Sequence, residues 1–161
     1  MTEQPRALHK IAFDLSEDAA AWARAAVEKL WVEKTDVRME VRVRNVPFYA
    51  KGVAFGDVVR VRIDHERRQI VYEEFVSESG HSAVRLIIMD DDANSRVVDV
   101  LRAHDCWWEV DISGRLWAVD VPPPVDYAMM RSSLLRLADE GAIGFEEAAL
   151  AAGHRQAAGL S

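Results

Sequence analysis

The tetrapeptide Ser79-Gly80-His81-Ser82 contains the residue types most suited to chemistry in this sequence of 161 residues. An imidazole flanked by two hydroxyls could act as a general base or activate a nucleophile. Glutamates shortly before it in the chain could orient the imidazole ring. The candidate catalytic set, which would suit a small hydrolase or nuclease, is His81, Ser79, Ser82 and Glu74.

The same tetrapeptide also fits a tight turn that has no catalytic role. Gly80 would take a positive φ, and the serine hydroxyls would bond to nearby backbone groups. We favour the turn, because polar loop residues stabilise turns more often than they catalyse reactions. A strand pattern also follows the tetrapeptide, whereas a helix follows a nucleophile elbow. The sequence therefore leans towards a protein that is not an enzyme.

Arginines alternate with apolar residues in two segments, 37–45 and 58–64, as in half-exposed strands. If the two strands are neighbours, their arginines share one face, which could hold a phosphate group or an acidic protein surface. Acidic residues interleave with them, so we favour an ordinary solvated face with cross-strand ion pairs. The stripe consists of Arg38, Arg42, Arg44, Arg60 and Arg62, with Arg67 and Arg68 at its edge.

Other polar clusters have simpler explanations than a metal or cofactor site. Asp90-Asp91-Asp92 precedes an expected helix and would cap it and complement its dipole. Cys106 is the single cysteine, which excludes an internal disulfide and a cysteine-rich zinc site. It is poorly placed to pair with His104, so we interpret it as a small core residue. Glycine fingerprints of nucleotide sites are absent, and we expect no metal and no cofactor.

Charge and composition limit the partners. The chain has 20 basic and 27 acidic residues, a net charge of −7, and half of its residues are hydrophobic. This is typical of a globular protein and argues against nucleic acid and membranes as partners. No signal-peptide pattern and no apolar run of membrane-spanning length occur, and with a free thiol this predicts a cytoplasmic protein. The oligomeric state is left open.

Residues 1–78 form a strand-rich first half in this interpretation. Ser16 is expected to cap a helix. The alanine-rich segment 17–29 is read either as that helix, over 19–29, or as an extended insertion. Short strands at regular spacing predict a small antiparallel sheet or a partly open barrel. The expected strands are 8–15, 37–45, 58–64 and 69–76.

Residues 79–147 switch to a mixed pattern of strands and helices, and 148–161 form an Ala/Gly-rich tail that we expect to fray. Asp126 is expected to cap the second helix, and Gly141 to end it. The order βαββα(β) predicts a ferredoxin-like half within an α+β protein. The expected elements are strands 83–89, 106–112, 115–121 and 142–147 and helices 91–104 and 126–140.

A two-residue turn at Ser113-Gly114 would join strands 106–112 and 115–121 into a hairpin. One face of this hairpin is then apolar and belongs to the core. The opposite face carries carboxylates around Trp107, which argues against an RNA platform and suggests an acidic exterior. The expected core of this half is Val84, Leu86, Ile88, Val97, Leu101, Trp108, Val110, Trp117, Val119, Leu134 and Leu137.

Several short segments stand out together by their order and spacing. They are 30–32 (Leu-Trp-Val), 45–48 (Asn-Val-Pro-Phe), Gly52, 56–59 (Gly-Asp-Val-Val), 79–82 (Ser-Gly-His-Ser) and 118–122 (Ala-Val-Asp-Val-Pro). In this order and spacing they resemble a bacterial family of uncharacterised proteins, domain of unknown function 4265. The resemblance covers roughly residues 8–147 and implies no activity. The alanine-rich stretch 19–26 departs from the family pattern.

We therefore expect a non-enzymatic protein-binding module, for example an antitoxin, immunity or regulatory factor. An acidic chain is suited to masking a basic partner. The alternative is the small hydrolase or nuclease centred on His81. Aromatic and rigid loop residues are suited to a partner-facing surface, and arginines of the stripe complement them. The candidate binding residues are Phe48, Tyr49, Arg42, Arg44, Arg60 and Arg62, with the turn Pro122-Pro123-Pro124 as a further surface.

Overall fold

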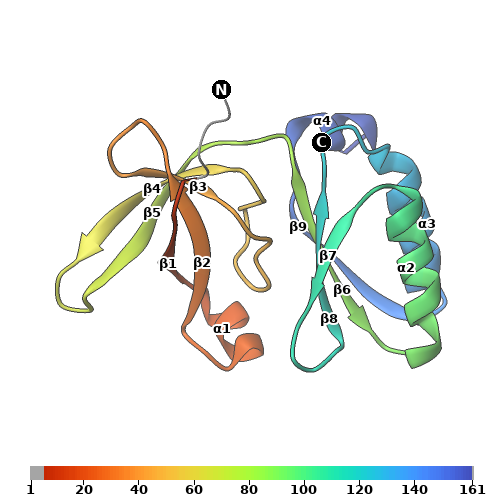
Figure 1. Cartoon of the computed structure of the whole chain (residues 1–161). Coiled ribbons are helices and arrows are strands. Elements are labelled where there is room, and N and C mark those ends of the chain that lie inside the picture. Colours follow the sequence, from red (N-terminus) through yellow and green to blue (C-terminus); the bar gives the residue numbers. More distant parts are fainter. Residues whose placement is uncertain (1–5, 161) are drawn as a thin grey trace.

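The computed structural model describes residues 6–160 and places two antiparallel sheets side by side (Figure 1). Residues 8–77 contribute the first sheet, and residues 82–149 contribute the second. Four α-helices occur within the described residues, and the protein is mixed α/β. No helix in this part of the chain is long and apolar enough to cross a membrane.

Five strands of the first sheet pair in sequence order, each antiparallel to the next. One further pair, Ala12 with Val71, joins the first strand to the fifth in parallel. Alternate side chains point inward to a small core that includes Ile11, Leu30 and Val59. The strands are β1 (Leu8–Asp14), β2 (Val27–Lys34), β3 (Glu40–Val43), β4 (Val58–Asp64) and β5 (Gln69–Ser77).

The alanine-rich segment is partly helix and partly strand. Ser16 caps α1 (Glu17–Ala23) as expected, and its hydroxyl accepts from the N–H of Ala19. The predicted extension of this helix to residue 29 is wrong. Arg24 takes a left-handed conformation that ends the helix, and the chain enters β2 at Val27, where antiparallel pairing with β1 overrides alanine's helix propensity.

The predicted strand 37–45 is also too long. Its regular part is β3, because Met39 has a φ of 67° and turns the chain just before it. Arg38 therefore lies outside the sheet, while Arg42 stays within it. The predicted strands 58–64 and 69–76 are confirmed as β4 and β5 within a residue.

The second sheet has the strand order β7-β8-β6-β9. Asp126 caps its longest helix as predicted, accepting from the N–H of Met129. Its strands are β6 (Ser82–Ile88), β7 (Trp107–Val110), β8 (Leu116–Val121) and β9 (Ile143–Ala149). Its helices are the 3-10 turn η1 (Asp91–Ala93), α2 (Asn94–Ala103), α3 (Tyr127–Asp139) and α4 (Ala152–Ala157).

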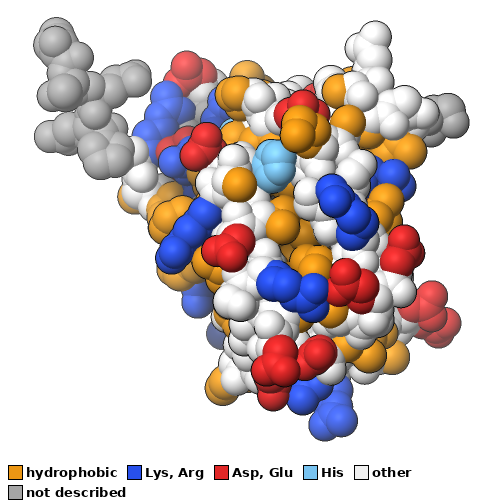
Figure 2. All heavy atoms as spheres, turned by 90° about the vertical axis from the view of Figure 1, so that its right-hand side faces the viewer, with side chains coloured by type: hydrophobic (Ala, Val, Ile, Leu, Met, Phe, Trp, Pro, Cys, Tyr) orange, Lys and Arg blue, Asp and Glu red, His pale blue; other side chains and the backbone are white. Residues whose placement is uncertain are grey.

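Helices α2 and α3 cover the face of the second sheet that points away from the first (Figure 1). Their outer surface mixes basic, acidic and hydrophobic side chains (Figure 2). An ion pair of 2.7 Å joins Arg96 of α2 to Glu140, the residue after α3. This face has no broad field of one charge.

The predicted core of the second half is largely confirmed, since nine of the eleven residues are buried. The prediction that Val110 is buried is wrong, because its side chain is 43% exposed. Trp108 is only half-buried. The pairs Val110–Trp117 and Trp108–Val119 form as expected, although the N–H of Gly114 closes the turn onto the carbonyl of Asp111. The turn is therefore centred on Ile112-Ser113, one residue earlier than predicted.

The face of the second sheet predicted to be an acidic exterior is largely covered by the first half. Ala83 and Ala118 pack there against Val46 and Ala54 of the long β3–β4 loop. Asp120 is buried in the same layer. The hairpin pattern could not reveal this cover, because it comes from a distant loop.

The predicted fraying tail is wrong. Residues 148–149 complete β9, and α4 follows. His154 of this short helix is buried, so the helix is held by packing and hydrogen bonds in spite of its Ala/Gly-rich composition.

Candidate functional site at the junction of the two sheets

The β3–β4 loop lies between the two sheets and is held from both sides. The Glu28 carboxylate accepts the backbone N–H groups of Phe48 (2.7 Å), Tyr49 (3.0 Å) and Ala50 (2.8 Å). On the other side, the Arg85 guanidinium of β6 donates to the carbonyls of Tyr49 (3.0 Å) and Ala50. The candidate binding residues Phe48 and Tyr49 therefore sit in a fixed loop.

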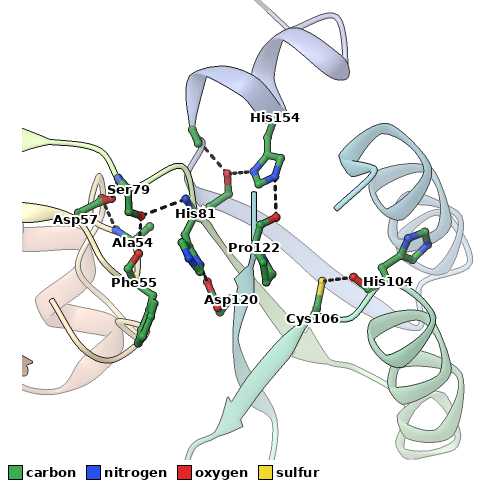
Figure 3. A network of polar contacts seen from close by, with 12 residues as sticks. Ala54, Phe55, Asp57, Ser79, His81, His104, Cys106, Asp120, Pro122 and His154 are labelled. Atoms are coloured by element: carbon green, nitrogen blue, oxygen red, sulfur yellow. Dashed lines mark hydrogen bonds and ion pairs between the residues drawn. The ribbon is translucent and has the colours of Figure 1, made fainter. Parts of the chain in front are cut away.

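His81 lies at the junction with its ring against a carboxylate (Figure 3). Its Nδ1 is 2.8 Å from Oδ1 of Asp120, and its ring centroid is 5.3 Å from that of Phe55. His81 also borders a cavity of about 540 Å³ that Glu78 and Arg155 help to line. The orienting carboxylate is thus Asp120 of β8, and no hydrogen bond joins His81 to the nearby glutamates within the described residues.

Asp120 is an uncommon group, a buried carboxyl next to an apolar layer. Burial raises the pKa of Asp120, and the hydrogen bond from His81 opposes that rise. The imidazole therefore stabilises the charge of a carboxylate that the sheet packing would otherwise disfavour. Such a pair can hold the ring orientation and tautomer that acid–base chemistry needs.

Ser79 and Gly80 form the turn that we favoured. Gly80 has a φ of 95°, as expected. The Ser79 hydroxyl donates to the Phe55 carbonyl (2.7 Å) and accepts from the backbone N–H of His81 (3.1 Å). Asp57 accepts the N–H groups of Ser79 and Ala54, which ties the turn to the first sheet. Ser79 is therefore engaged with the backbone.

Ser82 pairs with a different histidine. Its Oγ is 2.6 Å from Nδ1 of His154, and it also accepts the N–H of Ala151 (Figure 3). The other ring nitrogen of His154, Nε2, lies 3.0 Å from the Pro122 carbonyl, to which it donates. Both side chains are buried, so this serine–histidine pair is a satisfied structural network out of reach of a substrate.

The four residues of the candidate catalytic set do not assemble. Glu74 forms an ion pair with Arg60 on the first sheet, while Glu78 faces the N–H of Ala152. His81 alone keeps a free ring nitrogen near a cavity, since no hydrogen bond to its Nε2 occurs within the described residues. What the geometry assembles is the His81–Asp120 pair.

Five of the seven arginines in the stripe and at its edge are paired with carboxylates of the described residues, as in the solvated-face interpretation. Arg42 and Arg44 approach Glu33, and Arg44 also lies over the Phe55 ring at 4.8 Å. The remaining pairs are Arg60 with Glu40 and Glu74, Arg62 with Asp64, and Arg67 with Asp14.

Cys106 is buried next to Met130, which agrees with its interpretation as a core residue. Burial raises the pKa of its thiol to about 12, so almost no thiolate exists at pH 8. We expect the native protein to react with a disulfide reagent such as DTNB far more slowly than the unfolded chain. Equal rates with and without denaturant would contradict this.

Three residues that the sequence interpretation missed shape this junction: Arg85, Asp120 and His154. Arg85 had a signal, since it is the single charge in the apolar run 83–88. Asp120 sits in a strand whose every residue is buried, which pairing patterns alone do not reveal. His154 had no signal, because its partners lie far away in the chain.

The fold and this junction define an α/β protein in which a loop-bearing sheet packs on a helix-covered sheet. Residues 28–145 match the model of the domain of unknown function DUF4265. The match spans more than half of the chain, and the protein belongs to this family.

A solved structure described as a novel crystal structure of a hypothetical protein from Neisseria gonorrhoeae shares the fold. The TM-score is 0.69 at 11% identity, covering 92% of this chain and 98% of that one. None of the curated proteins matches the sequence.

Proposed function

We propose that the protein is a binding module whose protein partner adds an extended, basic strand to the edge strand β7. The observation that supports this is the position of β7, which ends the strand order and, among residues 6–160, pairs with β8 alone. A free edge offers N–H and C=O groups to an added strand, and this is a common mode of peptide recognition.

Apolar side chains surround this edge. Trp107 is 69% exposed, and Ile112 at the turn is fully exposed. Beneath Trp107 lies a cavity of about 270 Å³, lined also by Phe55 and Val46. Tryptophan is enriched at the centres of protein interfaces, where aromatic side chains and pockets provide most of the binding energy.

Charge near the edge favours a basic partner. Asp105 and Glu109 are exposed on or beside β7, and the whole chain has a net charge of −7. Opposite charge speeds association and suppresses wrong partners. An antitoxin, immunity or regulatory factor that masks a basic protein would use such a surface.

The test starts from partners captured in lysate of the native cell and identified by mass spectrometry, whose basic segments are made as peptides. The N–H of Asp111 bonds to Leu116 across the hairpin, so that of Val110 points to the free edge. We expect a true peptide to protect the Val110 amide from hydrogen exchange. Val110→Pro should weaken its binding by at least about tenfold.

Trp107→Ala should weaken binding of the same peptide. Met129→Ala, which removes a similarly exposed apolar side chain on α3, should leave binding unchanged. Melting temperatures of all variants should stay near that of the wild type. Protection confined to other elements, or full binding by Val110→Pro, would refute the edge-strand proposal.

A second candidate is the small hydrolase, supported by the His81–Asp120 pair beside its cavity. His81→Ala separates the two proposals. For a binding module, we expect a loss of about 1–3 kcal/mol of unfolding free energy, because the buried Asp120 carboxyl loses its hydrogen bond, and partner binding that falls no further than stability predicts. A stable His81→Ala variant that loses a measurable turnover would favour the hydrolase and refute the binding module.

We also infer the finer fold and the compartment. The elements β6-α2-β7-β8-α3-β9 in the order β7-β8-β6-β9 support a ferredoxin-like half. The single residue pair between β1 and β5 supports a small, partly open barrel. A free thiol supports a reducing cytoplasm.

A further inference from the structure

A third cavity, which no residue of β7 lines, lies between α1, the β3–β4 loop and the second sheet. Its volume is about 380 Å³, the size of a small-molecule site. Figure 1 shows the backbone arrangement there: α1 of the first half faces the second sheet. Aromatic residues Trp22, Phe48 and Tyr49 line it together with the apolar Ile87 and Leu116, and Arg85 is the buried cation among them.

Arg85 is 6% exposed and incompletely paired. Its Nη atoms bond to Tyr49, Ala50 and Glu146, whereas its buried Nε has no hydrogen-bond partner within residues 6–160. Burial also lowers the pKa of Arg85, which Glu146 opposes. An unpaired buried donor is costly, and a ligand acceptor that reached it would remove this cost.

A carboxylate hydrogen-bonded to Arg85, at 3.1 Å, is that of Glu146, whose side chain is half exposed. An incoming carboxylate can therefore displace it towards solvent and take over the guanidinium. Asp18 and Glu146 balance the two cations of the same cavity, Arg85 and Lys51, so the site has no surplus positive charge for ligands of higher negative charge, such as phosphate esters.

We propose that this cavity binds a small aromatic carboxylate, with its ring among Trp22, Phe48 and Tyr49 and its carboxylate on Arg85. Trp22 is 66% exposed on a short helix that buries none of its residues, and a planar ligand would cover it. Guanidinium and carboxylate match in planar geometry, which selects a carboxylate over a neutral polar group.

The probe is 2-naphthoate, with the neutral 2-naphthamide as its matched control. The side-chain Nε–H of Arg85 gives its own signal in ¹H–¹⁵N correlation spectra. We expect naphthoate to shift it saturably and to bind at least about tenfold more tightly than naphthamide. Absence of a saturable shift, or equal affinity for the two compounds, would overturn the proposal.

Variants that keep the fold test the location. Gly144 lines the cavity with an ordinary backbone φ, and a Cβ there would meet only Ile87 at 3.6 Å. Gly144→Leu should fill the cavity and weaken naphthoate binding by at least about tenfold. Trp22→Ala should weaken naphthoate binding as well. The affinity for naphthoate should be unchanged in the control variants Gly153→Leu on α4 and Trp107→Ala on β7.

Glu146→Gln is expected to raise the affinity for naphthoate instead of lowering it. Without the competing carboxylate, Arg85 should bind naphthoate several-fold more tightly. Unchanged or weaker binding by this variant, or unchanged binding by Gly144→Leu, would contradict the proposed placement. Because Trp107→Ala acts on β7 alone, this site and the strand-docking proposal can fail independently.

Discussion

Replacing Trp117 by alanine is expected to lower the free energy of unfolding by about 3–5 kcal/mol, the range for buried aromatic truncations. Trp117 is 5% exposed in the core of the second half, and its ring stacks on Trp108 with centroids 6.2 Å apart. Its indole N–H also donates to the Gly114 carbonyl at 3.1 Å. Chemical denaturation monitored by circular dichroism measures the loss.

Trp107→Ala is the matched control in the same hairpin. Its side chain is largely exposed, so the change should stay within about 0.5 kcal/mol of the wild type. If Trp117→Ala unfolds at the same denaturant concentration as Trp107→Ala, the hairpin register described above is incorrect.

Glu28→Ala is expected to lower the unfolding free energy by about 2–3 kcal/mol, because one carboxylate accepts three backbone N–H groups of the β3–β4 loop. Residues 48–50 would then lose these three hydrogen bonds to β2 and keep those that Arg85 donates to Tyr49 and Ala50. Amide hydrogen exchange at Phe48, Tyr49 and Ala50 should accelerate more than exchange elsewhere in the protein.

Glu28→Gln retains one carbonyl oxygen and similar shape, so its loss should be smaller than that of Glu28→Ala. It should also leave part of the amide protection in place. Equal stability of Glu28→Ala and the wild type would show that the loop is held by other contacts.

Periodicity in the sequence predicted most elements of the fold, because alternation and helical spacing report directly on buried faces. The apolar strand 83–88 and the helix after Asp126 are examples. Errors arose where pairing with a distant segment decided the local structure. Strand β2 begins at Val27 because it pairs with β1 there. Helix α4 is held in a defined conformation by the contacts of His154.

The candidate site was predictable only in part. The tetrapeptide 79–82 does mark the junction of the two sheets, and Gly80 has the expected conformation. The partners of His81 and Ser82 are Asp120 and His154, which lie 39 and 72 residues away. No local pattern specifies such pairs, because they follow from how the two sheets and the final helix pack.

Assembly during synthesis follows a definite order from the position of β9. Strands β1 to β5 are neighbours both in the chain and in the first sheet, so they can pair as soon as they leave the ribosome. Strand β6 is different, because one of its two neighbours is β9, which is synthesised much later. The hydrogen-bond partners of the Ser82 hydroxyl, Ala151 and His154, are also synthesised after β9. The first sheet can thus pair while the second half is still being synthesised, and the second sheet is complete only once β9 has been made.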